Sequence, residues 1–326
     1  MATSVTVTYR NPQSLAKRFR GRLRGGDQVA YAICWFFAAL VFALTVFLLA
    51  GLWIKADPAR SKFGFSFFSS TLWNPVTNEY GALPFVYGTL ITSCLALLIS
   101  VPLGVGAAIF LSELATAKVS NALTFLVELL AAVPSVIYGL LAIFTLVPLM
   151  RTYVEPALKA VFGFLPFFQG PIYGVGYLSA GVILSVMTFP FIISVSREAL
   201  LSVPREQREA ALALGATKWE STYQVVVPFA RLGIFGAIFL GLARALGETM
   251  AVTMVIGNDP AIHASLFAPG YTIAAVIANE FTEATGDMYL SALVELGLVL
   301  FLLTIVINAA ARLMIVLTTK KGSARA

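Results

Sequence analysis

The sequence predicts an all-α, polytopic membrane helix bundle with about six transmembrane helices. Its 326 residues are 59% hydrophobic and only 12% charged, and the mean hydropathy is +0.88, beyond the apolar share of ordinary soluble domains. Several uninterrupted apolar stretches reach the roughly 20 residues needed to cross a hydrocarbon core about 30 Å thick. We therefore interpret the length of this chain as a number of membrane spans and not as a number of globular domains.

Apolar runs between charged or Pro/Gly-rich breaks predict six spans, at 29–54, 84–111, 122–150, 176–197, 231–256 and 289–317. The first run follows a basic start, but it is about 26 residues long without a clear small-residue cleavage site, so we expect a retained anchor. Pro134 and Pro148 predict a kink or tilt in the third span, and the Phe-, Gly- and Pro-rich residues 151–175 predict an interfacial segment. Residues 271–278 are too short to span, which predicts a re-entrant or surface helix.

The basic residues predict the orientation of the chain. Sixteen Lys and Arg residues lie in the tail 1–28, near 118, at 197–231 and around the tail 318–326, whereas five lie on the opposite side. Positively charged flanks are retained in the cytoplasm, so both termini are expected there. These flanks account for the formal charge of +6, so the expected partner is the lipid bilayer and not nucleic acid.

The longest cytoplasmic connection, residues 198–230, is expected to form a helix-turn-helix elbow. Pro204 is followed by a run of strong helix formers up to Ala216, which predicts a short surface helix. Gly215 is suited to end this helix with a positive φ, and Thr217 is suited to cap a second helix. Pro228 is expected to close the segment.

Four ionisable residues fall within the predicted spans: Glu128, Arg244, Glu248 and Glu295. A central charge costs about 2.5 to 3.5 kcal/mol on insertion scales, so such residues usually face a bundle interior or a wet cavity. Arg244 and Glu248 are four residues apart and are expected to meet on one helix face. Glu128 and Glu295 either line the same cavity, relay protons, or are protonated and hydrogen-bonded to a neighbouring helix.

Small residues form a stripe on the face that carries Arg244: Gly233, Ala237, Gly241, Gly247 and Ala251. Such a stripe permits close helix contact, or it leaves room for a hydrated ligand beside a guanidinium that binds an oxyanion through two parallel hydrogen bonds. The residues alone leave both interpretations open.

Other kinds of site are not indicated. The sequence has no Gly-x4-Gly-Lys-Ser/Thr loop for ATP, and it has no cluster of nucleophile and base that predicts catalytic residues. His263 has no neighbouring Cys or second His, which favours a solvated loop residue over a metal ligand. We therefore expect no metal and no cofactor bound by this chain.

The elbow carries the first resemblance to a known family. Glu209, Ala210 and Ala211, followed by Gly215 and then by Val225-Val226-Val227-Pro228, resemble the EAA loop of type I ABC importer permeases, with valines where the family usually has Ile and Leu. The resemblance implies the type I transmembrane fold for a permease domain at 84–317, and an elbow that docks into a groove on a cytoplasmic ATPase. The alternative is an amphipathic helix that lies on the membrane.

The stretch Arg244-Ala245-Leu246-Gly247-Glu248-Thr249 resembles the R-A-x-G-E-T motif of the phosphate-specific, PstC-type branch of that family. The resemblance implies import of inorganic phosphate across the bacterial plasma (inner) membrane, with Arg244, Glu248 and Thr249 along the substrate pathway. It also implies a PstA-type sister permease, a PstB-type ATPase dimer that uses ATP, and a PstS-type extracytoplasmic phosphate-binding protein.

Three alternatives stay open. Another tetrahedral oxyanion, sulfate or molybdate, fits Arg244 equally well, because a guanidinium does not separate these anions by charge or size. An ion-coupled secondary anion carrier would use the buried carboxylates, but it needs no ATPase-docking element and often shows two related halves, which this sequence lacks. A membrane enzyme or receptor is the third.

Overall fold

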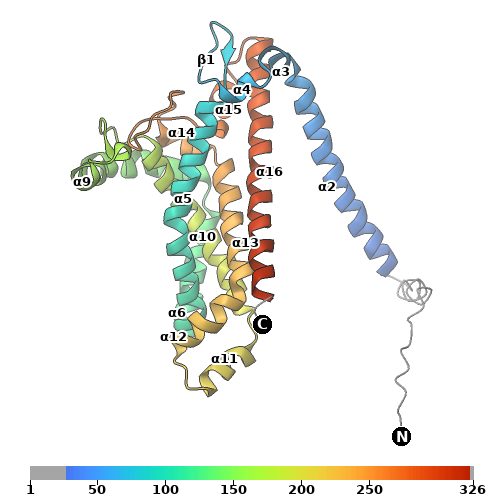
Figure 1. The fold of residues 1–326 in the computed structure, drawn as a ribbon, viewed down its shortest axis with the longest axis vertical. Coiled ribbons are helices and arrows are strands. Elements are labelled where there is room, and N and C mark those ends of the chain that lie inside the picture. Colours follow the sequence, from blue (N-terminus) through green and yellow to red (C-terminus); the bar gives the residue numbers. More distant parts are fainter. Residues whose placement is uncertain (1–26, 324–326) are drawn as a thin grey trace. The chain divides into compact units, whose positions relative to one another are not determined.

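The computed structural model describes residues 27–323, with side chains from 29 to 313, and it is mostly helical (Figure 1). Six described helices are long and apolar enough to cross a membrane: Val29–Lys55, Leu83–Leu114, Ser135–Phe162, Tyr177–Leu201, Lys218–Gly247 and Asp287–Leu313. The predicted all-α bundle with six spans is therefore confirmed. Residues 1–26 and 324–326 of the two predicted tails lie outside the described residues.

The chain divides into two units, residues 1–54 and 55–326, which we describe separately. The first unit contains nearly all of α2 (Asp27–Lys55), a helix of 29 residues. None of the side chains described in this helix up to residue 55 is buried, and large apolar ones such as Phe42 and Phe47 are more than 70% exposed. A surface of this kind is stable against lipid tails or a partner helix, not against water.

Three long helices form the centre of the second unit: α5 (Leu83–Ile109), α10 (Tyr177–Leu201) and α13 (Val227–Gly247). α10 lies between the other two and is the most buried of the six candidate spans. Small residues let the helices approach closely: a Cβ added to Gly181 would lie 2.6 Å from Leu95 Cβ, and one added to Gly104 would lie 2.8 Å from Ile192 Cγ2.

The prediction of a single third span at 122–150 is wrong. Two separate helices lie in this region, α6 (Ala117–Ala132) and α7 (Ser135–Leu141), with a break between them. Val133 and Pro134 have extended backbones with ψ of 129° and 142°. The pyrrolidine ring clashes with the preceding residue and disfavours helical geometry there, so Pro134 separates two helices and does not kink one.

Beyond α7 the chain stays helical to Phe162, because wide π turns precede its prolines. π turns at Ala142–Leu146 and Met150–Val154 each end two residues before a proline, Pro148 in α8 (Val147–Leu149) and Pro156 in α9 (Glu155–Phe162). A wider turn accommodates a ring that has no N–H to donate and that would clash with the carbonyl of an ordinary turn. The predicted interfacial segment 151–175 is therefore helical in its first half and irregular only after Phe162, apart from one 3₁₀ turn at Pro166–Phe168.

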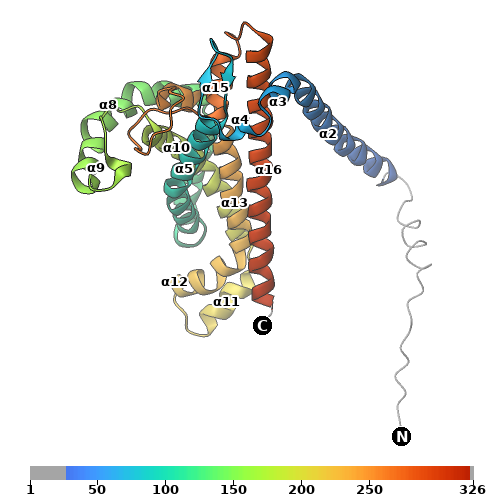
Figure 2. The ribbon, with the colours of Figure 1, turned by 45° about the horizontal axis from the view of Figure 1, so that its top comes forward.

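A cap closes one end of the second unit (Figures 1 and 2). It contains α3 (Asp57–Phe63), α4 (Ser66–Ser69), the antiparallel strands β1 (Trp73–Asn74) and β2 (Glu79–Tyr80), α15 (Ile273–Glu280) and the start of α16 (Asp287–Ser323).

The Glu280 carboxylate joins the cap by accepting hydrogen bonds from Trp73 Nε1 at 2.8 Å and from the Tyr289 hydroxyl at 2.7 Å. Burial is the main cause that raises the pKa of the Tyr271 phenol to about 12, so this residue of the cap stays neutral. The predicted short helix at 271–278 is present as α15, but Ile273 to Val276 are buried within the cap and do not lie on the surface.

The fifth predicted span, 231–256, is also interrupted. α13 ends at Gly247, and α14 (Met250–Ile256) begins after a break at Glu248 and Thr249. In Figure 1, α13 reaches only part-way along α16. At the end opposite the cap lies the elbow, residues 198–230, which contains α11 (Arg205–Ala213) and α12 (Lys218–Ser221) (Figures 1 and 2).

We predict that Gly88→Ala destabilises the fold by about 1 to 3 kcal/mol, because the added Cβ would overpack the contact between α5 and the cap. That Cβ would lie only 2.1 Å from the backbone oxygen of Tyr271. The measurement is thermal unfolding in detergent. Gly106→Ala on the same helix is the matched control, since its Cβ meets nothing within 4 Å. Equal melting temperatures for the two variants would contradict this packing.

Candidate functional site

The elbow has the local geometry that its sequence predicts. α11 ends in a Schellman motif, in which the N–H of Ala216 donates to the Ala211 oxygen at 3.2 Å and Gly215 has a φ of +88°. α12 begins with a capping box, in which Thr217 Oγ1 accepts from Glu220 N and the Glu220 carboxylate accepts from Thr217 N. The predicted helix stop at Gly215 and the predicted cap at Thr217 are both confirmed.

Pro228 does not close the elbow as expected. A π turn at Thr222–Val226 follows α12 and ends two residues before Pro228, which lies in the first turn of α13. The same arrangement at Pro148 and Pro156 keeps the helix continuous. The second arm of the elbow therefore runs without interruption into a membrane span.

The elbow exposes a mixed apolar and acidic surface. Glu209 and Ala210 are exposed, and Ala211 is half-buried. Large apolar side chains are exposed beside them: Leu212 (44%), Leu214 (90%), Trp219 (58%) and Tyr223 (68%). Leu212 and Leu214 lie outside the candidate spans, whereas Trp219 and Tyr223 lie in the first turns of the span Lys218–Gly247. An exposed apolar group of this kind is typical of a surface that contacts a protein or a membrane.

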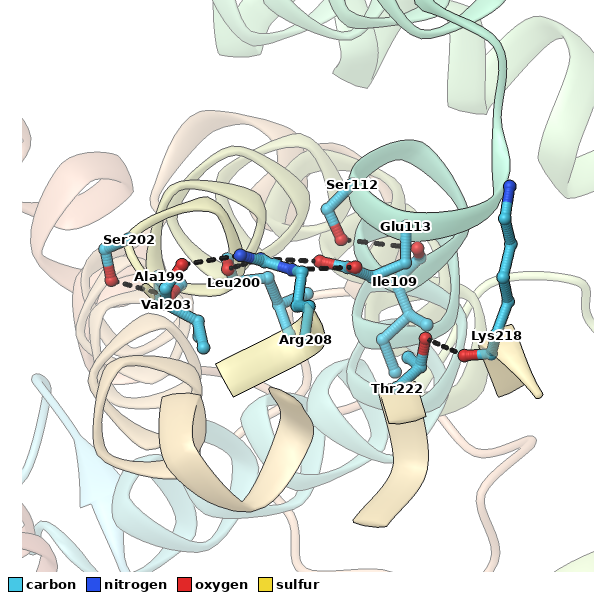
Figure 3. A network of polar contacts seen from close by, with 10 residues as sticks. All are labelled: Ile109, Ser112, Glu113, Ala199, Leu200, Ser202, Val203, Arg208, Lys218 and Thr222. Carbon is cyan, nitrogen blue, oxygen red and sulfur yellow. Dashed lines mark hydrogen bonds and ion pairs between the residues drawn. The ribbon is translucent and has the colours of Figure 1, made fainter. Parts of the chain in front are cut away.

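The side chain of Arg208 links α11 to the bundle, a contact that sequence reasoning missed (Figure 3). Its Nη2 lies 2.9 Å from Glu113 Oε1 and its Nε 3.1 Å from Glu113 Oε2. It also donates to the carbonyl oxygens of Leu200, at 2.7 Å, and Val203. The only signal in the sequence was the charged Glu113 at the end of an apolar run.

Arg244 lies half-buried near the end of α13. Its guanidinium carbon is 4.2 Å from the ring centre of Phe191 on α10, which is a cation–π contact. Its Nε is buried and has no hydrogen-bond partner among the described residues. The expectation that Arg244 pairs with Glu248 is wrong, because no ion pair joins them in the part of the chain that the structure describes.

Glu248 and Thr249 form the break between α13 and α14. The Glu248 backbone is extended, with φ −71° and ψ 129°, which turns its side chain away from the four-residue helical spacing to Arg244. Its carboxylate instead lies 3.5 Å from the backbone nitrogen of Ala251, in the first turn of α14. Thr249 Oγ1 donates to the Gly247 oxygen at 3.3 Å. Together these two residues satisfy part of the backbone that the broken helix leaves open.

The small-residue stripe makes close helix contacts along part of its length, and the predicted room for a ligand stays a prediction. A Cβ added to Gly233 would lie 2.3 Å from Ala199 Cβ, Ala237 is fully buried, and Gly241 lies against Ile192, so this part packs on α10. Gly247 is exposed, and an added Cβ there meets nothing within 4 Å. The exposed member of the stripe, Gly247, therefore lies three residues after Arg244 and next to the helix break, whereas Ala251 beyond the break is fully buried.

The two remaining carboxylates do not join Arg244. Glu128 is exposed on α6. Glu295 is 5% exposed in α16, where the adjacent Leu296 belongs to the apolar cluster under the cap, and its Oε2 has no partner among the described residues. Among residues with described side chains, no group of three or more His, Cys, Asp or Glu is placed to hold a metal ion, and His263 contacts Asp259 at 3.3 Å.

The chain is similar to known transport proteins. Residues 100–317 match the family described as "Binding-protein-dependent transport system inner membrane component". The chain is 50% identical to the phosphate transport system permease protein PstC of Mesorhizobium japonicum, over 85% of this chain and 84% of that protein. It is 48% identical to the protein of the same name from Xylella fastidiosa, over 88% and 89% of the two chains.

The fold also resembles a solved structure. A bacterial alginate ABC transporter, crystallised in complex with an alginate pentasaccharide-bound periplasmic protein, matches with a TM-score of 0.57 over 86% of this chain and 93% of that chain. The two sequences are only 18% identical, so this likeness concerns the fold alone.

We predict that Thr217→Ala loosens α12, because it removes the capping hydroxyl that accepts from Glu220 N. Loss of such a cap costs about 1 kcal/mol, so amide hydrogen exchange at 218–221 should become about fivefold faster. Ser202→Ala is the control, since that hydroxyl bonds only to the oxygen of Ala199 and lies outside the second arm. Unchanged exchange at 218–221 in Thr217→Ala would show that the cap does not hold the elbow.

Proposed function

This chain belongs to the family of binding-protein-dependent transport system inner membrane components, and on that premise we propose that it is the permease subunit that moves inorganic phosphate into the cytoplasm. The observation that carries the proposal is Arg244, a charged side chain beside a broken membrane helix with no acidic partner among the described residues. The names of relatives that are 47–50% identical support phosphate as the substrate.

The helix break and the arginine support a pathway at the same place. Non-helical backbone at membrane depth is tolerated only where it is buried in protein or lines a water-filled cavity. Arginine inside a membrane likewise faces a cavity or the bundle interior. Both occur between Arg244 and Thr249, and the adjacent Gly247 leaves open space.

Arg244 attracts the anion and holds it weakly. The planar guanidinium presents two parallel N–H donors to a tetrahedral oxyanion, while its face rests on Phe191. A transport site must release what it binds, and a single cationic side chain without further built donors satisfies that condition. Glu248 and Thr249 maintain the break next to it and line the same pathway.

The elbow couples the permease to ATP hydrolysis by another subunit. The sixteen basic residues on its side of the membrane support a cytoplasmic position for the elbow and both termini. An ATPase dimer docks on Glu209, Ala210 and Ala211, with Gly215 setting the angle between the arms and Pro228 the entry into α13. This chain binds no cofactor, and the ATP is used by that dimer.

Two further partners complete the importer. A sister permease covers the exposed membrane faces, including α6, where the exposed Glu128 carboxylate cannot face lipid cheaply. An extracytoplasmic phosphate-binding protein delivers the anion to the cap end. Glu295, buried in α16 next to Leu296 of the apolar cluster under the cap, forms no ion pair with Arg244 among the described residues, and we assign it to support of the cap.

We predict that Arg244→Gln lowers ATP-dependent phosphate uptake at least tenfold in vesicles that contain all the partners. A hydrogen bond from a charged donor contributes about 1.5 to 3 kcal/mol, and the variant loses two of them. Arg231→Gln, at an exposed position at the other end of α13, is the matched control and should transport normally. Assembly of each complex is checked before uptake is compared.

The same vesicles test the alternatives. Uptake driven by an ion gradient without ATP would contradict the ABC importer assignment and favour an ion-coupled secondary carrier. If sulfate or molybdate at equal concentration inhibits phosphate uptake, the substrate assignment would change to another oxyanion. Normal uptake in an assembled Arg244→Gln complex would return Arg244 to a structural role.

We predict separately that Glu209→Lys prevents co-purification of the ATPase and so abolishes uptake, because it reverses an exposed charge on the docking helix. Gln207→Lys adds a positive charge on the opposite side of α11 and serves as the control. Retention of the ATPase by Glu209→Lys would place the docking surface elsewhere.

A further inference from the structure

We propose that Arg208 is a positioning residue that transmits movement of the docking helix α11 to the membrane spans α5 and α10. The inference rests on the proposed function, because it concerns the step between ATPase docking and transport. The inference goes beyond the proposed function because it names the side chain that transmits the movement.

The contacts of Arg208 join three elements at one guanidinium (Figure 3). Two parallel hydrogen bonds, of 2.9 and 3.1 Å, reach Glu113 in the π turn Phe110–Leu114 that ends α5. Further hydrogen bonds reach the carbonyl oxygens of Leu200 and Val203 at the end of α10. The Arg208 and Glu113 side chains are only 20% and 10% exposed, so water competes poorly for the pair.

These contacts bring a charged donor to two carbonyl oxygens, of which Leu200 O also accepts from Val203 N at 3.3 Å. The last carbonyls of a helix have no donor within the helix, and a cation near that end is stabilised by the helix dipole. Leu200 is fully buried and Val203 nearly so, which leaves their oxygens little access to water. Arg208 therefore completes the end of α10 while it binds α5, and the three ends are held in one geometry.

The other residues of α11 contribute little to the attachment of this helix to the bundle. None of its nine residues is fully buried, so hydrophobic packing anchors it weakly to the bundle. A displacement of α11 by the ATPase is then carried mainly through the charged fork at Arg208. Because α11 packs loosely and is linked to the bundle mainly through Arg208, it can move as a rigid body and transmit this movement through that side chain.

α10 continues the route to the substrate pathway. Leu200 and Phe191 lie nine residues apart on this helix, about 14 Å along its axis. Phe191 is the ring on which Arg244 rests. A shift at the Arg208 end of α10 therefore reaches the guanidinium that binds the anion through one rigid helix.

The test compares Arg208→Gln and Glu113→Gln in the complete reconstituted importer, with ATP hydrolysis and phosphate uptake measured in the same vesicles. We expect both variants to assemble and hydrolyse ATP, and the number of phosphate ions moved per ATP to fall at least fivefold. Because the two residues act as a pair, the double variant should lose little more than Arg208→Gln alone.

Two matched controls separate this role from a general effect of substitution. Arg205→Gln is the same change on the same helix, at an exposed residue with no contact of this kind among the described residues. Ser112→Ala lies next to Glu113, and its hydroxyl bonds only to Ile109 of its own helix. Both should keep the wild-type ratio of phosphate to ATP.

A purely structural role gives a different result: fewer assembled complexes, but an unchanged ratio per complex, which overturns the proposal. If Arg208→Gln does not assemble, Arg208→Lys keeps the charge without the fork and should show an intermediate ratio. An unchanged ratio in an assembled Arg208→Lys complex again overturns it.

A distance measurement keeps this test independent of the substrate. Spin labels at Gln207→Cys and Val186→Cys, with Cys34 and Cys94 replaced, report the positions of the elbow and of α10, since both sites are exposed and Gln207 lies opposite the proposed docking face. When ATP binds, the two labels should keep their separation in the wild type and change it in Arg208→Gln. Absence of phosphate uptake in the wild type would instead count against the proposed function, and the label distances would still decide the role of Arg208.

Discussion

Backbone hydrogen bonding in lipid is the constraint on which the rest of this structure depends. Every N–H and C=O inside the hydrocarbon core needs a partner within the protein, so spans are helical and departures from the helix are confined to special places. Three prolines are accommodated by wide π turns that keep the helix continuous: Pro148, Pro156 and Pro228. The helix does break at Pro134, between α6 and α7, and at Glu248, between α13 and α14.

The break at Glu248 also explains why Arg244 is left without an acidic partner. On a continuous helix the two residues would lie one turn apart and neutralise each other. The extended backbone at Glu248 directs its carboxylate to the start of α14, 3.5 Å from Ala251 N. The cationic side chain is then held by an aromatic face, which leaves its N–H edges available for an anion.

Sequence reasoning succeeds here where structure is local and fails where it depends on distant residues. The number of spans, the positive φ at Gly215 and the cap at Thr217 follow from composition and short-range patterns. The break after Gly247 does not, because the apolar periodicity continues through it to Ile256. The link between Arg208 and Glu113 joins residues 95 positions apart, and no pattern in one sequence predicts which charged ends meet.

The two arginines show how one residue type serves opposite purposes through its surroundings. Arg208 has four of its five N–H donors occupied by a carboxylate and two carbonyl oxygens, and these hydrogen bonds restrict its movement. Arg244 has a buried Nε without a hydrogen-bond partner among the described residues, and its guanidinium lies over a ring face. An unsatisfied buried donor costs free energy until an anion supplies the acceptor. Because α10 carries both Leu200, which Arg208 contacts, and Phe191, on which Arg244 rests, Arg208 is suited to move the helix and Arg244 to respond at the site where we propose that the anion passes.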